Sequence, residues 1–213
     1  DMNDTDCLFD DLLCRSLSLF HQFRLYDDCV EEDNAFKALR EAEKIVSNTR
    51  NGICVAKLGC VIECLAHRFY IDDDTDGVLG EVDTFLIKFS KGLKHPSAEA
   101  FVASLWMGEY FLLRLKNPKS RTHSRSKKMV SKMLSFMADM LHKPEKQKEL
   151  CLSSNDVFEE TVDWVKEVCD MHICEKQMVL LLERLYSLQE KGMLQQGDGG
   201  KNTLRQQIWD FYY

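Results

Sequence analysis

Apolar residues recur every three or four positions along most of the chain, which is the spacing of one face of an α-helix. The stripes predict helices over about residues 5–25, 31–48 and 53–70. Further stripes follow over 78–89, 97–115, 130–141, 158–168 and 178–188. The segment 97–115 is apolar nearly all round, which is typical of a helix buried on most sides. We therefore expect a chain that is helical almost throughout.

Few residues in the sequence would break these helices. The 213 residues include only three prolines and ten glycines, whereas sheet sandwiches and barrels need many turn residues. Apolar helices alternate with more amphipathic ones, which is typical of layered arrays of helix pairs. No long linker divides the chain. We predict an all-α fold, an array of paired helices (α/α), in a single domain over residues 1–213.

Charge and cysteine usage limit the function classes. The net charge of −7 disfavours nucleic acid and anionic membranes, because both bind through lysine and arginine. No stretch approaches the length of a membrane span, and no signal sequence begins the chain. The nine cysteines are odd in number and mostly lie in helical patterns, so we interpret them as reduced, mostly buried thiols. These features predict a cytoplasmic protein.

Part of the sequence resembles the lanthionine synthetase C-like proteins. The segment Asn51–Ile87 carries an acidic turn at Asp74–Asp76 and an L-x-E-x-D-like pattern at Leu79–Asp83. Gly108–Pro118, which reads GEYFLLRLKNP, is similar to a second inner helix of that family. The resemblance covers about residues 30–120. It implies part of an α/α toroid and a bacterial peptide-modification setting.

The residues that carry that family's chemistry are missing. Its cyclases bind zinc through two cysteines and a histidine that include a Cys-His-Gly run, and their catalytic histidine precedes a glycine. This chain has no Cys-His dipeptide, and none of its six histidines precedes a glycine. We therefore predict a non-catalytic helical binding or accessory protein with a protein or peptide partner, and a homo-oligomer stays open. We assign no catalytic, cofactor-binding or metal residue.

An acidic turn between two predicted helices supports a calcium-binding alternative. Asp72, Asp74 and Asp76 occupy positions 1, 3 and 5 of an EF-hand-like loop, Gly77 occupies position 6 and Asp83 position 12. The competing interpretation is a polar turn in which Asp74, Thr75 or Asp76 caps the next helix. Position 12 holds aspartate where the loop usually has glutamate.

A zinc-dependent alternative rests on Cys169, His172 and Cys174. It describes a shortened lanthionine cyclase-like enzyme. A structural zinc site needs four ligands, and Cys151 could be a third only if the fold happened to bring it near. On one helix, Cys174 is rotated by about 140° from Cys169, so a single face supplies only two ligands. Buried thiols and a surface histidine are the competing interpretation.

Three other features are candidates for binding. The basic stretch Lys116–Lys128 could grip an acidic partner or form a solvated connection. Histidines 67, 95 and 142 fall at predicted helix ends, while His21 lies within a helix. The aromatic tail Trp209–Tyr213 either packs on its own core or meets another subunit, and we expect the first.

Overall fold

The computed structural model describes residues 2–27, 29–71, 74–93, 97–143, 147, 155–191 and 203–213. Within these residues the chain forms ten α-helices and no strand, several packed as pairs of sequence neighbours, which confirms the all-α array of paired helices. The chain divides into two compact units. Unit 1 covers residues 1–82 and 202–213, and unit 2 covers 83–201. The expectation of one domain over 1–213 stays a prediction.

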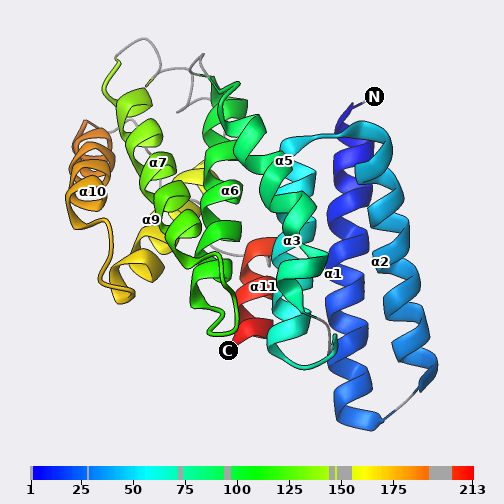
Figure 1. Ribbon diagram of the computed structural model, residues 1–213. Helices are drawn as coiled ribbons and strands as arrows, with labels where there is room; N and C mark the ends of the chain where they lie inside the picture. The colour runs from blue at the N-terminus through cyan, green and yellow to red at the C-terminus, as the bar shows by residue number, and fades with distance from the viewer. Residues whose placement is uncertain are drawn as a thin grey trace. The chain divides into compact units, whose positions relative to one another are not determined.

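Unit 1 is built on a helical hairpin, as Figure 1 shows. Its helices are α1 (Met2–Tyr26), α2 (Cys29–Thr49), α3 (Gly52–His67), the one-turn α4 (Thr75–Val78) and α11 (Leu204–Tyr212). Helices α1 and α2 lie antiparallel, α3 packs against both, and α11 packs against α1 and α3. The last helix of the chain thus completes a unit that the first three helices begin.

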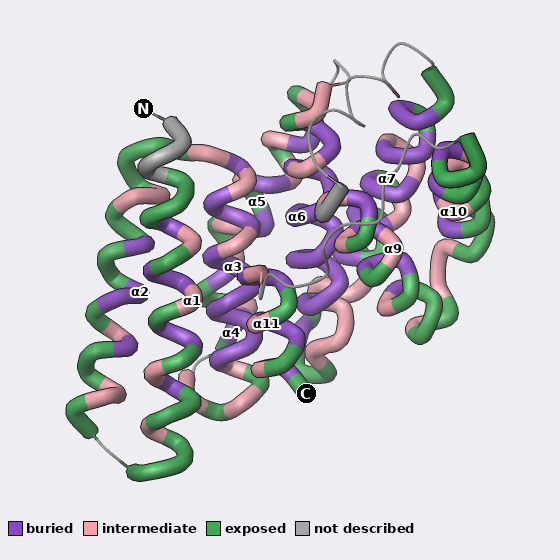
Figure 2. Tube along the Cα trace, turned by 180° about the vertical axis from the view of Figure 1, so that it is seen from behind, coloured by how far each residue is buried: buried purple, intermediate pink, exposed green. Residues whose placement is uncertain are grey.

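The core of unit 1 follows the predicted stripes. Helix α1 buries Phe9, Leu13, Leu17 and Phe20 along one face, spaced as neighbours on a helix. The buried Ser16 hydroxyl donates a 3.1 Å hydrogen bond to the Ala35 carbonyl of α2. Helix α3 is buried over most of its length, and Figure 2 shows it largely purple. The outer faces of α1 and α2 are mostly exposed and polar.

Unit 2 surrounds the apolar helix α6. Helix α5 (Gly80–Ser90) begins in unit 1 and continues in unit 2, followed by α6 (Ala98–Lys116), α7 (His123–Leu141), α9 (Asn155–Asp170) and α10 (Glu175–Glu190). Helix α6 packs on α7 and α9, and α10 packs on both of these. Nearly all of α6 is buried, as the sequence predicts. Gly108 of α6 allows the buried Trp164 ring of α9 to approach its backbone closely.

Side chains and prolines set the helix ends. The Asn51 side chain accepts a 2.8 Å hydrogen bond from the Ile53 amide at the start of α3, and the Ser97 hydroxyl accepts one of 3.1 Å from the Ala100 amide of α6. Helix α6 ends at Lys116, two residues before Pro118, as predicted. Most of the aromatic tail belongs to a helix, α11, which Thr203 caps.

The cysteines are less buried than the sequence suggests. Eight of them are described and all are free thiols, but only Cys54, Cys60 and Cys64 are buried. These three lie on α3, which neighbouring helices cover. The other five are exposed or half-buried, because they lie on outer helix faces or at helix ends: Cys7, Cys14, Cys29, Cys169 and Cys174. Cys151 lies outside the described residues.

Candidate functional site

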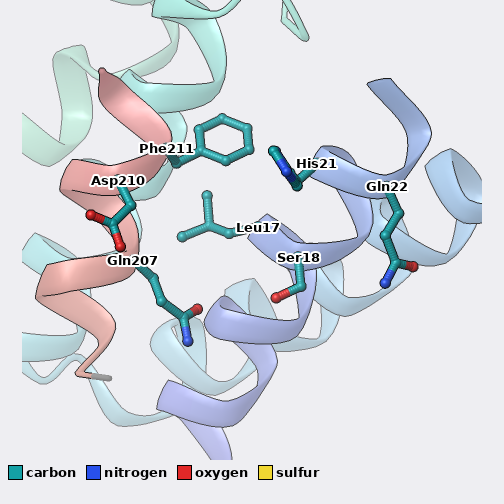
Figure 3. Close-up of a pocket in the computed structure, with 7 residues that line it drawn as sticks. All are labelled: Leu17, Ser18, His21, Gln22, Gln207, Asp210 and Phe211. Atoms are coloured by element: carbon teal, nitrogen blue, oxygen red, sulfur yellow. The ribbon is translucent and has the colours of Figure 1, made fainter. Parts of the chain in front are cut away.

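A pocket of about 360 Å³ opens in unit 1 between α1 and α11. Figure 3 shows its walls, which both helices contribute. Helix α1 supplies Leu17, Ser18, His21 and Gln22, and helix α11 supplies Gln207, Asp210 and Phe211. The volume lies within the range of small-ligand sites, although this pocket is open on one side. Leu17 lies between the two helices below the Phe211 ring, and the Gln207 side chain extends from α11 toward α1.

The polar residues of α1 share one face through their spacing. Ser18 and Gln22 are four residues apart, and His21 follows Leu17 by four, so these side chains lie on adjacent turns. Leu17 is only 2% exposed, whereas Ser18, His21 and Gln22 are exposed. The pocket therefore sits where the buried stripe of α1 meets its polar side.

Three contacts with α3 and its end fix the position of α11. Cys64 Sγ donates to the Ile208 carbonyl over 3.8 Å, and Arg68 Nε donates to the Phe211 carbonyl over 2.7 Å. The His67 and Tyr212 rings stack with centroids 4.1 Å apart and planes 13° apart. The expectation that the tail packs on its own core is confirmed, and this docking creates the second wall of the pocket.

Several residues of the pocket lining carry hydrogen-bonding groups. Asp210 Oδ1 accepts a 2.7 Å hydrogen bond from Gln206 Nε2 on the solvent side. Gln207 Oε1 is buried and has no hydrogen-bond partner among the described residues. Within the described lining, no hydrogen bond links Ser18, His21 and Asp210, and Figure 3 shows His21 and Asp210 on opposite sides. These three side chains therefore do not form the hydrogen-bonded set of a Ser-His-Asp triad.

The acidic turn is arranged as a helix cap. The Asp74 side chain accepts a 3.1 Å hydrogen bond from the Asp76 amide at the start of α4. Gly77 lies in α4 outside the left-handed conformation. Asp83 is 1% exposed, and its carboxylate accepts hydrogen bonds from Tyr110 (2.7 Å) and Arg114 (3.3 Å). Asp83 thus faces the interior of unit 2. Asp72 lies outside the described residues, and calcium binding stays a prediction.

The zinc candidates are placed around the turn that joins α9 and α10. Cys169 and His172 are exposed, and His172 Nδ1 lies 3.0 Å from the Cys169 carbonyl oxygen. Cys174 precedes α10, and its Sγ lies 4.0 Å from the Lys127 carbonyl oxygen. No three His, Cys, Asp or Glu side chains that could hold a metal gather anywhere in the described part of the chain. Cys151 lies outside that part.

The remaining candidates from the sequence are the basic stretch and the histidines. Within the basic stretch, Lys116 Nζ pairs with Glu167 of α9 at 2.5 Å, and α7 starts at His123. His67 and His142 lie at helix ends, as predicted, and His95 lies outside the described residues. His21 belongs to the pocket, a role that its position within α1 did not indicate. The sequence could not reveal the pocket, since its two walls come from distant segments.

No helix in the described residues combines the length and the apolar character that crossing a membrane requires. Comparisons with protein-family models, with curated proteins and with solved structures found no match to this chain.

Proposed function

We propose that this chain is a non-catalytic helical binding protein that holds a peptide segment of a protein partner in the α1–α11 pocket. One observation carries this proposal: carboxamide side chains from both helices, Gln22 and Gln207, line an open pocket of about 360 Å³.

The chemistry of the lining matches a peptide group. Gln22 and Gln207 each present a carbonyl acceptor and an amide donor, the same pair that a peptide bond offers in reverse. Leu17 and Phe211 add apolar surface for a side chain. A lining that mixes polar and apolar residues in this way can hold a segment by complementary hydrogen bonds and a small apolar contact.

The wider setting rests on the sequence resemblance. We propose a cytoplasmic accessory protein in bacterial peptide modification, which is the setting that the likeness to lanthionine synthetase C-like proteins implies. The shortened zinc-dependent enzyme and the calcium-binding module remain predictions, and no contact in the described residues favours either of them over peptide binding.

A titration with short peptides tests the proposal. Acetylated, amidated pentapeptides are added to protein labelled at the leucine methyl groups, and the Leu17 signal is followed by NMR. We expect this signal to shift, and Gln207→Ala to weaken binding about tenfold, as the loss of about one hydrogen bond predicts. Gln189→Ala, on the exposed side of α10, is the matched control. Unchanged binding in a Gln22→Ala/Gln207→Ala double variant would exclude the pocket.

A further inference from the structure

The Asp210 carboxylate gives the pocket a single formal charge of fixed position. Its Oδ1 is held by Gln206 Nε2 at 2.7 Å, one helical turn earlier on α11. No lysine or arginine among the described residues forms an ion pair with Asp210, and none lines the pocket. The remaining oxygen of Asp210 is thus open to a donor from outside the chain.

The surfaces beside Asp210 suit a long, partly apolar side chain. Leu17 forms the floor, and the Phe211 ring stands above it in Figure 3. Lysine and arginine pack their methylene groups on apolar surface while the charged end reaches polar groups. A guanidinium also gains from contact with an aromatic face. The Gln207 side chain adds a neutral polar residue to the same lining.

The charges in and around the pocket favour a basic ligand side chain over an acidic one. The whole chain carries a net charge of −7, and the only carboxylate in the lining would repel a second carboxylate. His21 is the only lining residue that can carry positive charge, and Figure 3 places it across the pocket from Asp210. Arg68 is not a lining residue, and its Nε already donates to the Phe211 carbonyl over 2.7 Å.

We infer that the pocket takes a lysine or arginine side chain of the bound peptide, with its cation against the Asp210 carboxylate. This inference rests on the proposed peptide-binding function and adds the class of side chain that the pocket recognises. The occupant is therefore a basic segment of a partner protein.

Three pentapeptides that differ only at the central residue test this inference: acetyl-Gly-Gly-X-Gly-Gly-amide with arginine, glutamine or glutamate as X. The Leu17 methyl signal reports the dissociation constant of each. We expect arginine to bind about tenfold more tightly than glutamine, and glutamate more weakly than both, with an arginine preference that falls as salt is raised. Asp210→Asn should bring the arginine peptide to the level of the glutamine peptide and leave the latter unchanged.

The controls separate failure of this inference from failure of the proposed function. Asp11→Asn removes one negative charge from an exposed site on α1 outside the pocket lining, so it should keep the arginine preference. If the three peptides bind equally tightly, and Gln207→Ala weakens the binding of each, the basic-residue inference is overturned and peptide binding is retained. Tightest binding of the glutamate peptide would also overturn the inference. Absence of any Leu17 shift would overturn both.

Discussion

The Tyr110 hydroxyl donates a 2.7 Å hydrogen bond to Asp83 Oδ1, and both side chains are almost completely buried. Arg114, one turn further along α6, contacts the other Asp83 oxygen at 3.3 Å. A carboxylate in the interior of unit 2 is thus matched by a phenol and a guanidinium. The network joins α5 to α6 and depends on its members being present together.

Loss of the Asp83 carboxylate should destabilise the chain strongly. Asp83→Ala leaves the buried Arg114 without this counter-ion, so we expect a loss of about 3–5 kcal/mol in the free energy of unfolding. Tyr110→Phe removes only one hydrogen bond and should cost about 1–3 kcal/mol. Urea unfolding followed by circular dichroism measures both. An Asp83→Ala variant as stable as the parent would contradict this account of the network.

A methyl group at Gly108 should also be poorly tolerated. A Cβ there would collide with the ring of Trp164, which is fully buried and has no room to move. We expect Gly108→Ala to lower the free energy of unfolding by about 1–3 kcal/mol. Gly77→Ala is the matched control, because a Cβ at Gly77 meets nothing within 4 Å. The idea fails if both variants have the same thermal midpoint.

Docking of α11 should respond to acid through His67. Burial, and then the charge of neighbouring Arg68, lower the pKa of His67 from its ordinary value of 6.5. The unfolded chain therefore takes up this proton at a higher pH than the folded chain, so stability falls as pH drops through about 6.5. The effect should be small, because part of the His67 ring faces solvent.

The comparison for this prediction is His67→Phe, which keeps a ring against Tyr212 but does not titrate. Urea midpoints measured at about pH 7.5 and about pH 5.5 should differ less in this variant than in the parent chain. Identical pH dependence in the two proteins would show that His67 does not contribute.

The thiols should react in an order set by their surroundings. Burial, followed by the negative charge of Asp6, raises the pKa of Cys54 to about 11, while Cys169 is exposed. Because the thiolate is the reactive form, we expect iodoacetamide at about pH 8 to label Cys169 well before Cys54. Mass spectrometry of digested samples gives the order. Labelling in urea should abolish the difference, and equal native rates would contradict the burial of Cys54.

Helix periodicity predicted most of the fold but could not place the pocket. The stripes over 5–25 and 97–115 predicted the helices in which Leu17 and Leu105 are buried, because a core position follows from the residue's own spacing. His21 was placed within a helix but given no partner, since its pocket exists only where α11 docks. Asp83 looked like the twelfth position of a calcium loop for the same reason, because its partners Tyr110 and Arg114 lie on another helix.

Unit 1 is divided in the sequence, and this has a consequence for the order of folding during synthesis. Helices α1 to α3 emerge from the ribosome first, whereas α11 follows the whole of unit 2. Unit 2 can pack as soon as it has emerged, but the apolar surface that α11 covers on α1 and α3 must wait. Leu17 is made early and meets Phe211 last, so a nascent chain has no ligand pocket until its translation reaches α11.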